Sequence, residues 1–221
     1  MSNILTTHVG SLPRSKELSE FLFAKDKGEK FSQSSFDEVL KNNVESVVKR
    51  QLDVGIDFVS DGEMSKISYA TYIKDRIDGF SGESERRAPA DLDDFPEYKE
   101  KIAKSGGTPT YTRPCCTNEL KVKDETSLLQ DINNFKNSLD KLNHRHAFMN
   151  SASPGVINVF MPNKFYSTED EYLDKLSNIM AKEYELITKS DIQVQLDCPD
   201  LALARHMNFK NLSEDEFIKR A

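Results

Sequence analysis

The sequence predicts an α/β protein with a parallel sheet, and it favours a barrel over an open nucleotide-binding sheet. Near residues 35–60 and again near 168–196, a capped amphipathic helix leads into an apolar strand. Polar or reactive residues follow each expected strand, at the end where (β/α)8 barrels and open α/β sheets both place their sites. No G-x-G-x-x-G and no phosphate-binding loop follows any strand.

Composition excludes several classes of protein. The chain has 221 residues, with 30 Lys+Arg against 37 Asp+Glu, and therefore a formal charge of −7. This acidic balance argues against nucleic acid as a partner. Three Cys in so long a chain exclude a disulfide scaffold. No apolar run is long enough to span a membrane, and the first residues lack a signal-peptide pattern. We expect a soluble, cytoplasmic globular protein with neither nucleic-acid nor membrane partners.

The expected strands occur at fairly regular intervals. In chain order they lie at residues 3–8, 56–60, 108–113, 146–150 and 192–196. Turn residues follow them, including Val9-Gly10-Ser11, Asp61-Gly62-Glu63 and the turn 151–155.

Capping boxes announce the helices between these strands. Ser35–Glu38 and Thr168–Glu171 each have a hydroxyl residue followed three positions later by Glu, ahead of an apolar periodic run. Gly55 is expected to end the first of these helices. A third helix is expected over residues 126–141, where five apolar residues share one face.

One charged stretch interrupts the alternation. Residues 81–107 are weakly apolar, with a short helix expected at 95–104. We interpret this stretch as an excursion or lid within a single domain that spans residues 1–221, because the strand–helix alternation resumes after it.

The chain is shorter than a whole barrel. About five strand–helix units are expected, and an eight-stranded barrel typically takes ~250 residues. A further capping box at Ser213–Glu216 opens a helix only about two turns before Ala221. The expected fold is therefore an incomplete barrel, truncated on its C-terminal side.

Carboxylates follow two of the strands. Asp61 and Glu63 are suited to bind a substrate ammonium or to act as a base, although a solvated loop is an equal alternative. Asp197 ends an otherwise apolar strand, and Asp200 and Arg205 nearby are expected to balance each other's charge. We expect Asp197 to be functional.

Cysteine, histidine and serine residues form no complete site by spacing. Side chains of adjacent residues such as Cys115 and Cys116 point to opposite faces of a strand, so they form a poor metal pair, and at least one is expected to be buried. His144 and His146 precede a strand and are expected to be surface or packing residues, whereas His8 and Cys198 lie at the carboxyl ends. The candidate serines are Ser11, Ser151 and Ser153, and none lies in a G-x-S-x-G elbow.

Several motifs together resemble a known family. They are Thr6-Thr7-His8-Val9-Gly10-Ser11-Leu12-Pro13-Arg14, Val54-Gly55-Ile56-Asp57-Phe58-Val59-Ser60-Asp61-Gly62-Glu63, Thr112-Arg113-Pro114-Cys115-Cys116, Ala152-Ser153-Pro154-Gly155 and Gln195-Leu196-Asp197-Cys198-Pro199-Asp200-Leu201. In this order they resemble the catalytic domain of cobalamin-independent methionine synthase. They are especially similar to its short single-domain relatives, which include zinc-dependent alkyl transferases that act on coenzyme M.

The resemblance implies a fold, a reaction and a set of site residues. The fold would be a (β/α)8 TIM barrel of the methionine synthase and uroporphyrinogen decarboxylase type. The reaction would be zinc-dependent transfer of a methyl group to the sulfur of homocysteine or a similar thiol. Substrate binding would fall to Val9, Gly10, Ser11, Glu63 and Asp197, and the methyl-donor side to Arg113 and Cys115. The donor would be a folate or a corrinoid protein.

The zinc ligands are where this chain departs from the family pattern. The family binds zinc through a His-x-Cys pair, a Glu and a further Cys, and no His-x-Cys occurs here. Cys198 stands where the full-length synthase commonly has a glutamate. The resemblance therefore places the ligands beyond Ala221 and assigns no metal residue in this chain.

Three alternatives stay open. The chain would be a non-catalytic or partner-dependent barrel fragment, which dimerises or completes its barrel with another chain. It would transfer an alkyl group to another thiol, such as coenzyme M. Or it would be a barrel decarboxylase related to the uroporphyrinogen enzymes, which Gln195-Leu196-Asp197 fits less well.

Overall fold

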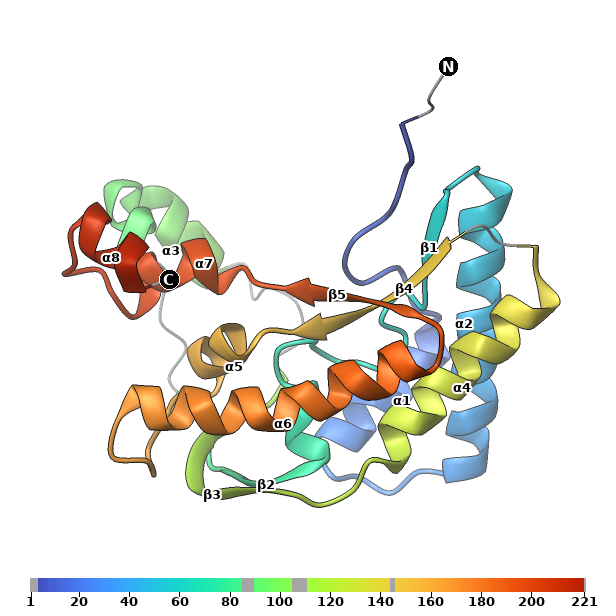
Figure 1. Cartoon of the computed structure of the whole chain (residues 1–221), viewed down its shortest axis with the longest axis horizontal. Helices are drawn as coiled ribbons and strands as arrows, with labels where there is room; N and C mark the ends of the chain where they lie inside the picture. Colours follow the sequence, from blue (N-terminus) through green and yellow to red (C-terminus); the bar gives the residue numbers. More distant parts are fainter. Residues whose placement is uncertain (1–3, 85–89, 105–110, 144–145, 221) are drawn as a thin grey trace.

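The computed structural model describes residues 4–84, 90–104, 111–143 and 146–220 (Figure 1). The amino-terminal elements are α1 (Lys16–Asp26), α2 (Gln33–Asp53), β1 (Phe58–Ser60), the 3-10 helix η1 (Tyr72–Asp75) and β2 (Ile77–Ser81). The central ones are the 3-10 helix η2 (Ala90–Asp94), α3 (Pro96–Lys104), β3 (Cys115–Val122), α4 (Thr126–Lys141) and β4 (His146–Ala152). The last ones are α5 (Pro154–Phe160), α6 (Glu169–Lys189), β5 (Gln193–Asp197), α7 (Asp200–Met207) and α8 (Glu214–Arg220).

A parallel sheet lies at the centre of the fold. Its strand order is β1-β4-β5, and its register places Asn150 opposite Gln195. The amino-terminal segment runs beside β1 and joins it through a single parallel bridge between Thr7 and Phe58. The strands predicted at 56–60, 146–150 and 192–196 are therefore confirmed, whereas the one predicted at 3–8 is reduced, within the described residues, to a bridge.

The strand predicted at 108–113 is wrong in the part that the structure describes. Residues 111–114 lie outside any strand, and 105–110 lie outside the described residues. The strand β3 begins instead at Cys115 and pairs antiparallel with β2 in a separate two-stranded sheet. Pro114 has no N–H to donate to a sheet, so the strand begins after it rather than before it.

This correction lowers the strand count of the expected barrel. In the described residues the parallel sheet has three strands and the Thr7 bridge, rather than about five units. The fold is therefore α/β with a parallel sheet and a separate antiparallel pair of strands, and its closure into a barrel stays a prediction.

Most helix boundaries follow local capping chemistry. The helix α4 matches its predicted range, 126–141. The helix α6 begins after Thr168, whose hydroxyl accepts a hydrogen bond from the Glu171 N–H at 3.1 Å. At α8 the capping box is reciprocal: the Ser213 N–H donates to Glu216 Oε2 at 2.8 Å, and Ser213 Oγ accepts from the Glu216 N–H.

Three helix predictions need correction. The first predicted helix, α2, starts at Gln33 under a Ser32 cap, three residues before the predicted cap at Ser35. The helix α1 was not predicted, because few apolar residues mark its buried side. In the predicted turn 151–155, Pro154 instead begins α5 under the cap residue Ser153.

The helices α2, α4 and α6 lie side by side along one face of the parallel sheet (Figure 1). The apolar core is divided in two. One cluster joins α1, α2 and α4 to β1 and β4, around Phe135, Leu18 and Val48. The other joins α5 and α6 to the β2–β3 pair, around Tyr172 and Leu176. The site lies at the carboxyl ends of β1 and β5.

The predicted excursion is described only in part. The expected short helix is present as α3, and η2 packs against α7 (Figure 1). A role as a lid stays a prediction. In the described part of the chain, no helix has both the length and the apolar character required to cross a bilayer.

Candidate functional site

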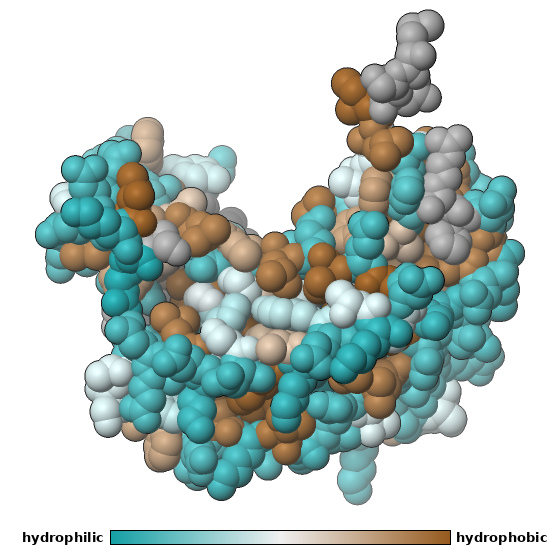
Figure 2. Space-filling model, in the orientation of Figure 1, coloured by the Kyte–Doolittle hydropathy of each residue, from teal (hydrophilic) through white to brown (hydrophobic). Residues whose placement is uncertain are grey.

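All five residues predicted to bind substrate line one hollow of about 440 Å³. They come from the amino-terminal turn, the turn after β1 and the carboxyl end of β5, and they are Val9, Gly10, Ser11, Glu63 and Asp197. Tyr69, Leu196, Cys198 and Pro199 complete the lining. The face of the molecule shown in Figure 2 is deeply hollowed between the region of α7 and α8 and the amino-terminal segment.

Glu63 is the most constrained residue of this hollow. Its backbone has a φ of 56°, a left-handed conformation that is uncommon for a residue with a side chain. Ser11 Oγ donates to its Oε2 at 2.7 Å, while its Oε1 is buried without a hydrogen-bond partner. Burial raises the pKa of the Glu63 carboxyl, and the Lys66 ammonium and the Ser11 hydroxyl act against that rise. One oxygen of the carboxylate therefore has an unused capacity to accept a hydrogen bond.

Arg14 holds the turn that carries Glu63. Its guanidinium donates to the main-chain oxygens of Glu63 at 2.8 Å and of Lys66 at 2.6 Å. Asp61 supports the same turn from the other side, because its Oδ1 accepts from the Glu63 N–H at 3.1 Å. Asp61 is 2% exposed and Glu63 1%, so the solvated-loop alternative is wrong for both.

Asp197 is held by amides on two neighbouring strands. Asn150 Nδ2 lies 2.9 Å from its Oδ2 and 3.2 Å from its Oδ1, and Gln195 Nε2 donates to Oδ1 at 3.1 Å. Asp197 itself is half-buried at the hollow. Arg205 pairs with Glu214 at 3.8 Å, while Asp200 accepts from Ser153 Oγ at 2.6 Å, so the expected balance between Asp200 and Arg205 is wrong.

A buried polar cluster lies below the hollow. Lys66 is 3% exposed, and its Nζ donates to the main-chain oxygen of Asn150 at 2.5 Å. The same ammonium lies 5.2 Å from the centre of the Tyr72 ring. Tyr72 and Ser65 both donate to Asp131, whose pKa burial raises to about 6.

The residues predicted for the methyl-donor side line a different hollow, of about 300 Å³. Arg113 and Cys115 contribute to it, together with Phe160, Lys164 and others. The Arg113 guanidinium carbon lies 4.6 Å from the centre of the Phe160 ring, and its Nε is buried without a hydrogen-bond partner. This pocket combines a flat cation, a ring and an unused donor.

The three cysteines differ in how deeply they are buried. Cys115 and Cys116 are both buried, as expected for at least one of them, and burial raises the pKa of Cys116 to about 11. Cys198 is half-buried, and burial raises its pKa as well. Among the described residues, no three His, Cys, Asp or Glu side chains come together in a group that could hold a metal. These residues therefore do not fit a zinc ion.

His146 and Ser151 contact other residues of the fold and line none of these hollows. His146 stacks on Phe58 with ring centres 4.4 Å apart, as expected of a packing residue, and His144 lies outside the described residues. Ser151 is buried and donates to Glu183 at 2.6 Å.

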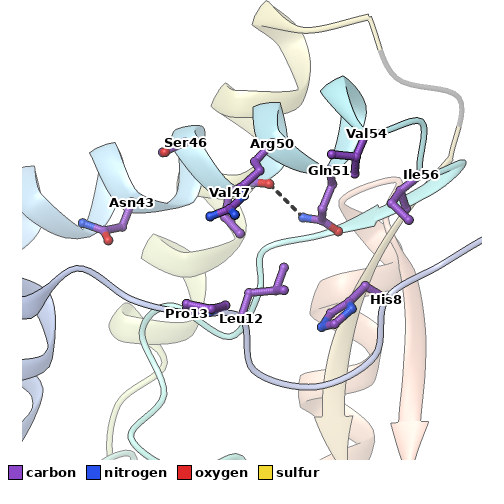
Figure 3. Close-up of a pocket in the computed structure, with 10 residues that line it drawn as sticks. All are labelled: His8, Leu12, Pro13, Asn43, Ser46, Val47, Arg50, Gln51, Val54 and Ile56. Carbon is purple, nitrogen blue, oxygen red and sulfur yellow. Dashed lines mark hydrogen bonds between the residues drawn. The ribbon is translucent and has the colours of Figure 1, made fainter.

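A third hollow, of about 280 Å³, lies between α2 and the amino-terminal segment (Figure 3). Its lining includes His8, Leu12 and Pro13 from the segment and Val47 and Arg50 from α2. His8 is therefore on this side of the segment, whereas the next three residues line the substrate hollow. None of the predicted substrate residues lines the hollow of Figure 3.

Sequence reasoning missed four residues at or near the substrate hollow: Tyr69, Arg14, Lys66 and Asn150. Burial, together with the charges of Asp197 and Glu63, raises the pKa of Tyr69 to about 12. Arg14 lies in a quoted motif, and only its role went unrecognised. The other three lie in stretches without a motif, and a buried lysine or asparagine carries no periodic signal.

Comparison with known proteins finds cobalamin-independent methionine synthases among the proteins similar to this chain. Residues 4–89 match the family described as the catalytic domain of cobalamin-independent synthase. A methionine synthase from Sulfolobus acidocaldarius is 26% identical over 195 residues, which is 88% of this chain and 51% of that protein. A 5-methyltetrahydropteroyltriglutamate–homocysteine methyltransferase from Bifidobacterium adolescentis is 31% identical over 75 residues, 34% of this chain and 10% of that enzyme.

A solved structure has the same fold. The B12-independent methionine synthase of Shewanella sp. W3-18-1, determined in complex with selenomethionine, matches with a TM-score of 0.64 at 15% identity, over 89% of this chain and 52% of that one. The chain thus spans about half the length of the Sulfolobus relative and of this structure. The resemblance predicted from the motifs, to methionine synthase-like methyltransferases, is confirmed.

Proposed function

We propose that this chain, a relative of the cobalamin-independent methionine synthases, carries the amino-acid site of a thiol S-methyltransferase that acts on homocysteine or a similar thiol. The observation that carries the proposal is the unused, buried Oε1 of Glu63 beside Asp197. A buried carboxylate oxygen without a donor costs free energy unless a ligand satisfies it.

The ligand group that suits these two acids is an ammonium. An ammonium has three donors, and the two acids Glu63 and Asp197 line one hollow. The free oxygen of Glu63 takes one donor and Asp197 takes another. The Shewanella structure is a complex with selenomethionine, which carries the same ammonium as homocysteine, and this supports the proposal.

The contribution of these residues to the reaction is orientation. Fixing the ammonium at Glu63 and Asp197 fixes where the sulfur at the other end of the amino acid lies, and so reduces the entropy lost on reaching the transition state. A bound zinc ion would supply a lowered thiol pKa, and zinc dependence is part of the proposal for the whole enzyme through the family resemblance. The described residues do not fit zinc, and they act in the proposal only on the amino acid.

The methyl donor is proposed to approach from the hollow at Arg113 and Cys115. The flat guanidinium and the Phe160 ring offer a stacking surface, and the unpaired Nε offers a donor to a carbonyl or carboxylate oxygen. These features suit a folate better than a corrinoid protein, because a folate has a flat ring and carboxylates. The cytoplasm, where folates occur, is the proposed location.

The two acids also discriminate between thiols. Coenzyme M carries a sulfonate and no ammonium, so Glu63 and Asp197 would repel it rather than bind it. Homocysteine is therefore favoured over coenzyme M as the acceptor.

Titration calorimetry on the full chain tests the proposal. L-homocysteine and L-methionine are expected to bind, and Glu63→Gln and Asp197→Asn are each expected to weaken binding by about tenfold or more, as for a lost charged hydrogen bond. Glu38→Gln, an exposed carboxylate on α2, serves as the matched control and should not change affinity.

The pH dependence has a defined sign. Glu63 must be ionised to bind an ammonium, and its pKa is raised by burial, so affinity should fall as the pH drops through that raised pKa. The analogue 4-(methylthio)butanoate, which is an anion without the ammonium, should bind more weakly than methionine, and its affinity should fall neither at lower pH nor in either variant. If neither amino acid binds, or if coenzyme M binds as well as homocysteine, the proposed function is wrong.

An assembly role has one observation in its favour. The strand β5 lies at the edge of the parallel sheet, and Leu196 on it is 46% exposed. An edge of this kind can pair with another chain. Sedimentation velocity of the full chain distinguishes the cases: a homo-oligomer or a complex with a complementing chain supports assembly, and a stable monomer that binds homocysteine contradicts it.

A further inference from the structure

Asn150, on β4, contacts Asp197 through its side chain and Lys66 through its main chain. Its side-chain amide donates toward both carboxylate oxygens of Asp197, at 2.9 and 3.2 Å, from the neighbouring strand. The residue is 1% exposed, so its side-chain amide is itself shielded from water. An amide can orient a carboxylate in this way without neutralising the charge that a ligand ammonium needs.

The main chain of Asn150 serves the other acid. Its carbonyl oxygen accepts from Lys66 Nζ at 2.5 Å, and this fixes a buried ammonium three residues after Glu63. The Lys66 charge opposes the effect of burial on the Glu63 carboxyl. One residue therefore contacts Asp197 directly and holds the counter-charge of Glu63.

We infer that Asn150 is a positioning residue that sets the two carboxylates of the hollow relative to each other before the amino acid binds. The inference rests on the proposed function, because it assigns Asn150 a role toward the same ammonium. Preorganised acids need not be reoriented when the ligand arrives, so the free energy of ordering them is not subtracted from the affinity.

A double-mutant cycle tests whether Asn150 acts through Asp197. Asn150→Leu keeps the shape of the side chain and removes its donor, so it should weaken L-methionine binding by about tenfold, as for a lost charge-assisted bond. In the Asp197→Asn background the same substitution should cost less than about twofold, because the partner is already altered. Binding of 4-(methylthio)butanoate, which has no ammonium, should not weaken in any of these variants.

A matched control separates positioning from packing. Asn134 on α4 is also buried, at 5% exposure, and its Nδ2 has no hydrogen-bond partner in the described residues. Asn134→Leu should leave the affinity for methionine as it is in the wild type. Equal losses for the Asn150 and Asn134 variants, or a full tenfold loss for Asn150→Leu in the Asp197→Asn background, would overturn the inference.

A second measurement needs no ligand and no variant at position 150. The side-chain amide protons of Asn150, followed by ¹⁵N NMR, should exchange slowly with solvent in the wild type. They should exchange at least about tenfold faster in Asp197→Ala, which removes their acceptor. Unchanged exchange overturns the inference even if homocysteine binds. Failure of homocysteine to bind, with exchange behaving as expected, overturns the proposed function instead.

Discussion

The guanidinium of Arg14 donates a hydrogen bond to the main-chain oxygen of Glu63, 2.8 Å away, and so fixes the backbone of the residue whose side chain faces the hollow. The contact joins the amino-terminal segment to the turn that follows β1. Glu63 holds a left-handed φ of 56°, and this conformation persists only where surrounding contacts impose it. Arg14 provides such contacts through Nη2 and Nε, the latter donating to the Met64 oxygen at 3.4 Å.

Arg14→Met is predicted to loosen the Glu63 turn. The main-chain oxygens of Glu63 and Lys66 would lose a charged donor, which typically costs about 1.5–3 kcal/mol of unfolding free energy. Urea denaturation measures this loss, and homocysteine affinity should fall with it. Arg50→Met is the control, since Arg50 is exposed on α2 and such changes usually stay within about 0.5 kcal/mol. Equal stabilities for the two variants would show that the Arg14 contacts do not hold the turn.

Asp131 is predicted to make stability depend on acid pH. Its pKa is about 6 in the folded protein against an ordinary 3.8, so its stabilising contribution is complete below about pH 3.8 and is lost as the pH rises to about 6. That shift corresponds to at most about 3 kcal/mol, at 1.36 kcal/mol per pKa unit. The difference in unfolding free energy between Asp131→Asn and the wild type should therefore increase in favour of the variant from pH 4 to 6.5, and then level off. A pH-independent difference contradicts the assignment.

The buried ion pair between Arg76 and Glu183 is predicted to be far more costly to break than to replace. Both side chains are about 5% exposed, and Arg76 Nε already lacks a partner. Arg76→Met alone should cost about 3–5 kcal/mol, because Glu183 would stay buried and uncompensated. The double variant Arg76→Met with Glu183→Leu should recover much of that loss in urea denaturation. No recovery in the double variant would mean that the pair itself stabilises the fold.

Cys198 is predicted to be the thiol that reacts first in the native protein, and to react slowly. Cys115 and Cys116 are buried, whereas Cys198 is half-buried, with a pKa raised by burial and by Asp200. A chromogenic disulfide reagent should label about one thiol slowly at pH 8, and all three after unfolding. Cys198→Ser should abolish the native labelling. Rapid labelling of all three thiols would contradict the burial of the pair on β3.

Local sequence predicts elements well where one strong periodicity has no competitor. Residues 126–141 became α4 without adjustment, because Leu128, Ile132 and Phe135 form a single face. At α2 the sequence did not identify the cap residue. Ser32 and Ser35 are both of a type that caps helices, but it is Ser32 Oγ that accepts a hydrogen bond from the Ser35 N–H. The pairing of β3 with β2 could not be predicted from local sequence either, because it joins residues more than thirty positions apart.

The sequence by itself determined the family resemblance, the parallel arrangement of strands and the identity of five residues that line one hollow. The motifs carry the resemblance. The five residues are expected at one hollow because parallel strands have their carboxyl ends at the same edge of a sheet. Neither argument needs contacts elsewhere in the chain. Only the tertiary structure decided that Glu63 keeps an unused oxygen, that Arg14 imposes its backbone conformation, and that Asn150 and Lys66 support the two acids. The physical reason is that burial and hydrogen bonding depend on groups brought together from distant positions, and no spacing along the chain encodes them.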